Sequence, residues 1–133
     1  MAIVMYLGLR QSNKTEQAQQ ILKKAAQRCH KSVWPCPIVN YLRRGVTLQE
    51  VLNEANKPER IGTAITTTQK KVGVYRPPRP RLSTEAHTYI ALDIALTADK
   101  NQAYPHLQWV HDYGERLSFE YQLALAKLGR FKK

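Results

Sequence analysis

The chain has 133 residues, the size of one domain, and its hydrophobic content of 43% is ordinary for a protein that folds in water. Its 21 Lys and Arg outnumber its 10 Asp and Glu, and the formal charge of +11 favours acidic partners: nucleic acid, an acidic protein surface or anionic lipid. A well-solvated surface with a basic tail explains the same charge without any partner. The apolar start, MAIVMYLGL, lacks a basic flank and is too short to cross a bilayer, which argues against a signal peptide and a membrane span.

This apolar start is instead predicted to form the first helix. A second helix is predicted from about Asn13 or Thr15 to Cys29, because Asn13 and Glu16 have the spacing of a capping box and apolar residues recur behind them. The first helix has no capping residue before it. We therefore expect either that the chain is part of a longer repeat protein or that a second subunit covers this helix in a homo-oligomer.

Two short helices are predicted next. Pro37 suits the first turn of one helix, and Gly45 is predicted to end it. Thr47 with Glu50 forms a second capping box, which opens another helix that ends near Asn56.

The segment Lys57–Leu82, called here the basic insertion, interrupts the helical pattern. It holds four of the seven prolines, and between Lys57 and Arg81 there are seven basic residues and one acidic residue. A connection of this length is uncommon in a compact domain and usually has a function or is disordered. The composition of the basic insertion predicts either a flexible arm, extended at Arg76–Arg81, or a small β-hairpin that pairs Thr63–Thr68 with Lys71–Tyr75.

Three amphipathic helices are predicted in the remainder. The pair Ser83–Thr84 can cap the first of them. Pro105 is tolerated only in a first turn, so the second should begin close to Ala103, and Gly114 is predicted as its left-handed stop. The third should begin at about Leu117.

Two stretches of the chain match each other in order and spacing. The matched positions are Tyr6-Leu7-Gly8-Leu9 with Tyr89-Ile90-Ala91-Leu92, and Ala18, Leu22 and Ala25 with Ala103, Leu107 and Val110. This register of small and apolar residues resembles a tetratricopeptide repeat, present in about two copies over three quarters of the chain. The segment Trp34–Ala55 resembles the helical connector found near the end of many bacterial proteins of that family.

The resemblance implies one all-α domain over residues 1–133, in which short helical hairpins stack as a solenoid, with the basic insertion between them. It also implies a protein that binds another protein, because repeat solenoids present long grooves.

No arrangement of residues predicts catalysis. Cys29, His30 and Cys36 lie close together but lack the second half of a zinc site. No serine sits in a nucleophile elbow, and no glycine-rich loop is suited to phosphate. We therefore expect no enzyme, no cofactor and no metal. Two cysteines do not make a disulfide framework, so they predict reduced thiols and a cytoplasmic location.

Two functions remain. The first is an adaptor or assembly factor, part of a larger complex, that binds a protein partner through its helical surfaces and the basic insertion. The second is nucleic-acid or ribonucleoprotein binding through the basic insertion and the basic C-terminus. Trp109 has the spacing of a wedge between helices as well as that of a contact residue. The predicted contact residues are basic or aromatic: Lys70, Lys71, Tyr75, Arg76, Arg79, Arg81, Tyr104 and Trp109.

Overall fold

The computed structural model describes residues 2–29, 33–56, 60–61, 64–65, 80–97 and 100–131. These residues form seven helices and one pair of two-residue strands, so the predicted all-α class is confirmed. In chain order the elements are α1 (Ala2–Gln11), α2 (Thr15–Gln27), α3 (Cys36–Leu42), α4 (Leu48–Ala55), β1 (Arg60–Ile61), β2 (Ala64–Ile65), α5 (Pro80–Thr97), α6 (Lys100–Tyr113) and α7 (Phe119–Phe131).

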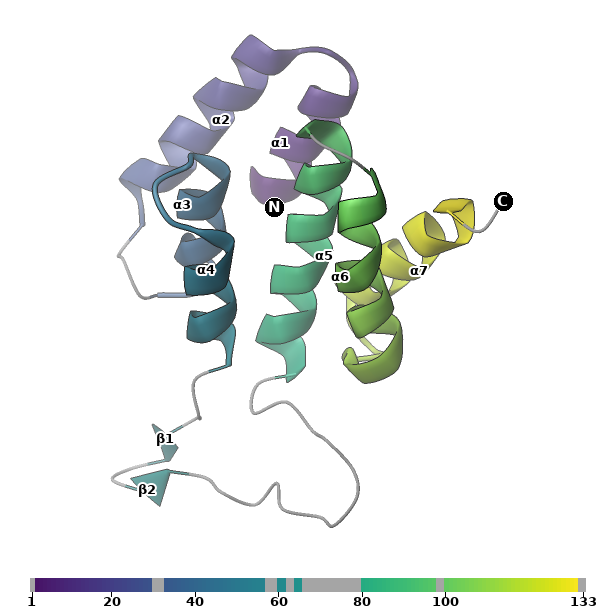
Figure 1. Cartoon of the computed structure of the whole chain (residues 1–133). Coiled ribbons are helices and arrows are strands. Elements are labelled where there is room, and N and C mark those ends of the chain that lie inside the picture. The colour runs from purple at the N-terminus through teal and green to yellow at the C-terminus, as the bar shows by residue number, and fades with distance from the viewer. Residues whose placement is uncertain are drawn as a thin grey trace.

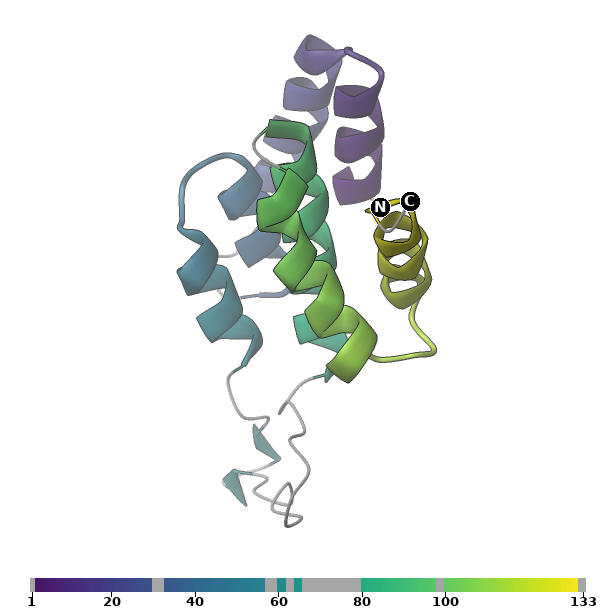
Figure 2. The same ribbon diagram turned by 45° about the vertical axis from the view of Figure 1, so that its right-hand side comes forward.

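Helix α5 is the centre of the fold. It packs against α1, α3, α4, α6 and α7, and Figure 1 shows it between the N-terminal helices and the C-terminal pair. In the turned view of Figure 2, α3 and α4 lie on one side of the α5–α6 pair and α7 lies on the other. A helix surrounded in this way buries most of its circumference, and every residue from Ser83 to Ala91 except Glu85 is buried.

Two apolar clusters form the core, one on each side of α5. The first joins α1–α4 to α5, and its fully buried members include Tyr6, Leu22, Ile38 and Ile90. The second lies between α5, α6 and α7, and its buried members are Ala91, Ala103, Leu107, Val110, Ala124 and Leu128. Because α5 contributes to both clusters, it connects the two halves of the core.

The two matching stretches form two helical hairpins, α1–α2 and α5–α6. Ala18 and Leu22 on α2 are fully buried, as are their counterparts Ala103 and Leu107 on α6. Burial matches at these two pairs but not at every matched position, since Gly8 is exposed and Ala25 is half-buried while their counterparts Ala91 and Val110 are buried.

The start of α2 differs from the prediction. Asn13 has φ 62°, and no side-chain hydrogen bond caps α2, which begins after Lys14. Instead, the Asn13 N–H donates to the Arg10 carbonyl at 3.2 Å and the Lys14 N–H donates to the Leu9 carbonyl at 2.8 Å. This is the pattern of a helix C-terminus with a left-handed residue after it. The predicted capping box was wrong, because Asn13 ends α1.

The end of α3 also differs. Arg44, with φ 66°, is the left-handed residue there, and the N–H of Gly45 donates to the Asn40 carbonyl at 2.8 Å. The prediction that Gly45 stops the helix was therefore one residue off. A left-handed arginine is strained, and its side chain supplies the compensation. Its guanidinium donates to both carboxylate oxygens of Asp93 on α5, at 3.0 and 3.4 Å.

The hydroxyl of Tyr41 joins the same group. Its pKa is raised to about 12, first because it is buried and then because it lies beside the charge of Asp93 and is hydrogen-bonded to it. Asp93 itself is almost completely buried, at 1% exposure. A buried carboxylate needs partners of this kind, and here they come from α3 and the turn after it.

The predicted cap at Thr47 is confirmed, since its hydroxyl accepts from the Glu50 N–H at 3.2 Å. The predicted cap of α5 was wrong. This helix begins at Pro80, so Ser83 and Thr84 lie inside it and are buried. The Thr84 hydroxyl donates to the Pro80 carbonyl at 2.6 Å and accepts from the Glu115 N–H at 2.8 Å, which ties α5 to the turn between α6 and α7.

Helix α6 begins at Lys100, three residues before the predicted start, so Pro105 lies inside it. Helix α7 begins at Phe119, where the Ser118 hydroxyl accepts from the Tyr121 N–H at 3.1 Å. Leu117, the predicted start, is 96% exposed in the preceding turn.

Gly114 ends α6 because of close packing and not through a left-handed backbone. A Cβ added there would lie 2.5 Å from the Val110 carbonyl and 3.2 Å from the Tyr121 ring.

We expect Gly114→Ala to lower the free energy of unfolding by about 2 kcal/mol, because the backbone has to shift. Urea unfolding measures this. Gly129→Ala is the matched control, since nothing lies within 4 Å of its added Cβ, and it should be stabilising by about 0.5–1 kcal/mol. Equal effects of the two changes would contradict the packing argument.

Two described pieces of the basic insertion form an antiparallel pair, with Arg60 opposite Ile65 and Ile61 opposite Ala64. The predicted hairpin paired Thr63–Thr68 with Lys71–Tyr75. The described partner of Ala64–Ile65 is the preceding segment, and Lys71–Tyr75 lies outside the described residues.

Cys29 and Cys36 form a disulfide, with their Cα atoms 5.5 Å apart. The prediction of reduced thiols was wrong, because α2 and α3 meet at these two residues and bring their Cα atoms to disulfide distance. The cysteines consequently no longer support the predicted cytoplasmic location.

Candidate functional site

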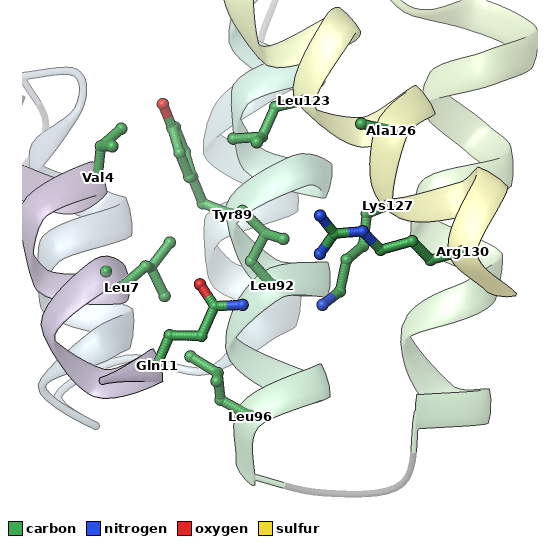
Figure 3. Close-up of a pocket in the computed structure, with 11 residues that line it drawn as sticks. Val4, Leu7, Gln11, Tyr89, Leu92, Leu96, Leu123, Ala126, Lys127 and Arg130 are labelled. Carbon is green, nitrogen blue, oxygen red and sulfur yellow. The ribbon is translucent and has the colours of Figure 1, made fainter. Parts of the chain in front are cut away.

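An apolar groove runs along α5 between α1 and α7 (Figure 3). This cavity is called here the groove, and its volume is about 270 Å³. The residues that line it come from α1, α5 and α7: Val4, Leu7, Gly8, Gln11, Tyr89, Leu92, Leu96, Leu123, Ala126, Lys127 and Arg130. Helical periodicity explains the lining, because each helix contributes residues three or four positions apart. Side chains from three helices therefore face one space.

The two ends of the groove differ chemically. Figure 3 shows Val4, Tyr89 and Leu123 at one end and Leu96 toward the other, while the basic groups of Lys127 and Arg130 extend from α7 toward Leu92 on α5. The pKa of Lys127 is lowered, first by burial and then by repulsion from Arg130 and Lys100. The groove thus combines an apolar floor with a cationic end.

Tyr89 is held in place at the floor of the groove. Its hydroxyl donates to the Glu120 carboxylate at 2.7 Å, which connects α5 to α7. Burial raises the pKa of this hydroxyl, and the hydrogen bond to Glu120 raises it further, so Tyr89 stays a neutral donor. On the neighbouring turn, Glu85 accepts from the Trp34 indole N–H at 2.7 Å.

A second cavity adjoins the cationic end. It is called here the basic cleft, has a volume of about 600 Å³ and is lined by Lys100, Asn101, Tyr104, Lys127 and Arg130. None of the three cations forms an ion pair with an acidic side chain of the described residues. Three like charges face one cleft, and an anion is the natural counterpart.

The predicted contact residues fall into three groups. Tyr104 is 37% exposed and lines the basic cleft. Arg81 is exposed in the first turn of α5, away from both cavities. Lys70, Lys71, Tyr75, Arg76 and Arg79 lie outside the described residues.

Trp109, the remaining predicted contact, packs on α5. Its ring stacks on His87, with centroids 4.2 Å apart, and the His87 Nδ1 lies 2.9 Å from the His106 Nδ1. This placement is that of a wedge between α5 and α6. One imidazole has to donate and the other has to accept, so at least one of them is neutral.

Burial lowers the pKa of His87 to about 3, with repulsion from His106 as a smaller cause, and burial also lowers the pKa of His106. The unfolded chain takes up a proton on each histidine near pH 6.5, while folded His87 stays neutral until about pH 3. The unfolded state therefore binds more protons between these values, and stability falls as the pH falls.

We expect His87 alone to remove roughly 2 kcal/mol of stability between pH 7 and pH 5. Urea unfolding at both pH values measures the loss. His87→Phe keeps a ring against Trp109 and should show a smaller loss, whereas His111→Asn at an exposed position should behave like the unchanged protein. The same pH dependence in all three proteins would refute the assignment to His87.

The described residues show no metal-binding cluster, since no three His, Cys, Asp or Glu side chains gather closely enough to hold an ion. Within the same segments, each helix is too short or too polar to cross a bilayer. Comparison with protein-family models, curated proteins and solved structures found no match for the chain.

Sequence reasoning missed most of the groove. Lys127 and Arg130 were considered only as part of the basic C-terminus, and Leu92 was noticed only as part of the repeat. The available signal was the recurrence of Leu123, Lys127 and Arg130 on one face of α7, which becomes meaningful only once α1 is known to lie opposite.

Proposed function

We propose that this protein is a non-enzymatic adaptor that binds a partner protein through the groove, with the basic insertion as a second contact. The observation that carries the proposal is the open apolar floor with a cationic end. An apolar surface of this kind gains free energy when a partner covers it. The cations favour a partner segment that has apolar side chains and acidic groups.

The groove suits side chains better than it suits a cofactor. Its volume of about 270 Å³ is below the usual range of small-molecule sites. Apolar side chains from one face of a partner segment, helical or extended, fit such a space. The partner's acidic groups would then lie beside Lys127 and Arg130.

The tetratricopeptide-like solenoid is part of this proposal. It is supported by the two hairpins α1–α2 and α5–α6, which bury Ala18 and Leu22 in the first and their counterparts Ala103 and Leu107 in the second. In this arrangement α1, α5 and α7 line one surface, and the groove lies on it. Fold alone does not establish function, so the groove carries the argument.

The test is capture of partners from a lysate of the source organism, with and without nuclease, on the unchanged protein and two variants. Leu92→Gln alters the floor of the groove, and Ile21→Gln is a matched control on α2, at a similarly half-buried position outside the groove. We expect a protein that resists nuclease and is retained by the unchanged chain and Ile21→Gln but lost with Leu92→Gln. Capture that is unaffected by Leu92→Gln would contradict the proposal.

A second candidate function is nucleic-acid binding, which the charge favours. Between Lys57 and Arg81, seven basic residues and one acidic residue supply about half of the net charge of +11. Binding of this kind should weaken steeply with salt, because each neutralised phosphate releases counterions. Recovery of nucleic acid alone, eluting steeply with salt, would favour this function over the adaptor.

Association of two copies over α1 belongs to the same proposal. Met5, on the outer face of α1, is 56% exposed. Sedimentation as a monomer at high concentration would remove this part of the proposal without affecting the groove.

A further inference from the structure

The groove and the basic cleft lie next to each other, because Lys127 and Arg130 line both of them. The groove lies between α1, α5 and α7, and the cleft lies between α6 and α7. A segment whose apolar side chains occupy the groove would therefore bring its next residues to the cleft. The two cavities together favour a partner segment in which an apolar stretch is followed by an anionic group.

The charge of the cleft indicates more than one negative charge in that group. Lys100, Lys127 and Arg130 bring three formal positive charges, and the described residues contribute no carboxylate to balance them. The three cations line one cleft, and burial, followed by repulsion from Arg130 and Lys100, lowers the pKa of Lys127. One carboxylate balances one of these charges, whereas a phosphorylated side chain carries about −1.5 to −2 at pH 7 and offers three acceptor oxygens.

The donors also suit a phosphate in shape. The guanidinium of Arg130 is a planar fork that binds two oxygens of one phosphate, and each lysine acts as a compact point charge. They come from two helices, α6 and α7, so they surround the cleft instead of following one surface stripe.

We infer that the partner segment received by the groove is phosphorylated, with its apolar side chains over α5 and its phosphorylated residue in the basic cleft. This inference rests on the proposed adaptor function, because it names the chemistry of the segment that the groove binds. A partner protein is favoured over nucleic acid, since the cleft opens from a floor of leucines that a sugar–phosphate backbone would leave uncovered.

The first experiment uses three synthetic peptides that differ at one position. Each carries two leucines followed by phosphoserine, glutamate or serine, and binding to the full chain is measured by isothermal titration calorimetry and by amide shifts in NMR. We expect the phosphoserine peptide to bind about tenfold more tightly than the glutamate peptide, because it makes further charge-assisted hydrogen bonds. This advantage should shrink at pH 5, below the second pKa of phosphate near 6.

Single substitutions separate the cleft from the groove. Lys100 is exposed and lines the cleft but not the groove, so Lys100→Gln should preserve the fold and reduce only the advantage of phosphoserine. Lys23→Gln, at an exposed position of α2, is the charge-matched control. Leu92→Gln should weaken all three peptides alike. Equal affinities of the phosphoserine and glutamate peptides, or an advantage that Lys100→Gln leaves intact, would overturn the inference.

A second experiment distinguishes failure of this inference from failure of the adaptor function. The lysate is treated with phosphatase before capture on the unchanged protein and on Leu92→Gln. Loss of the captured protein after phosphatase supports a phosphorylated segment. Capture that resists phosphatase but still depends on Leu92 overturns the inference and leaves the adaptor function standing. Tighter binding of an oligonucleotide than of the phosphoserine peptide would assign the cleft to nucleic acid.

Discussion

Ile90→Ala should lower the free energy of unfolding by about 4 kcal/mol, the largest effect expected of a single substitution here. Ile90 is fully buried at the middle of α5 and belongs to the cluster that joins this helix to α1–α4. Removing its side chain loses apolar burial and leaves a cavity that cannot easily collapse, because α5 is held from several sides. Chemical unfolding monitored by circular dichroism measures the loss.

Ile90→Val provides the graded comparison. It removes one methyl group and should cost about 1 kcal/mol. The same substitution at Ile21, which is only half buried, should cost less. A central role for α5 would be untenable if Ile90→Ala cost no more than Ile90→Val.

Arg44→Met should lower the free energy of unfolding by about 3 kcal/mol. The side chain of Asp93 is 1% exposed, and without Arg44 its charge is left in the interior without its cationic partner. The expected value is at the low end for a broken buried pair, because the side chain of Arg44 is 54% exposed and water already screens it.

Replacing the other member of the pair, Asp93, should lower the free energy of unfolding by less. Asp93→Asn removes the buried charge and leaves an arginine that water can solvate, so we expect about 1–2 kcal/mol. The double variant Arg44→Met with Asp93→Asn should be more stable than Arg44→Met alone, and a double-mutant cycle measures this coupling. If the effects of the two substitutions simply add, the pair does not contribute in the way argued here.

The helices could largely be predicted from the sequence, because apolar residues at helical spacing indicate a helix whichever element it packs against. Thr47 was assigned correctly for the same reason, since a cap depends on neighbours within one turn. Thr84 shows where this reasoning stops. A hydroxyl near a helix start resembles a cap, but this one is used by a backbone N–H 31 residues away.

The helix ends also depend partly on contacts between residues that are far apart in the sequence. Asn13 and Arg44 take left-handed conformations, but Asn13 was predicted to cap the following helix and Gly45 was preferred to Arg44 as a helix stop. For Arg44 the deciding partner is Asp93 on another helix, 49 residues away. Local propensity cannot include such a contact, which is why the assignment to Gly45 was wrong.

The candidate site was predicted in part. Tyr104 was predicted as a contact residue, and it lines the basic cleft together with Lys127 and Arg130 from the basic C-terminus. The groove itself depends on α1, α5 and α7 lying side by side, which no spacing within one helix shows. Trp109 was more ambiguous, because helical periodicity is the same for a wedge and for an exposed contact.

The position of α5 along the chain also matters for how the protein is made. A ribosome completes α1–α4 first, and the first apolar cluster then still lacks Ala86, Tyr89 and Ile90. At ordinary rates of translation, a few seconds pass before α5 has been synthesised. During that interval the apolar side chains of α1–α4 that pack on α5 are uncovered, so the nascent chain offers chaperones an apolar surface that the finished protein buries.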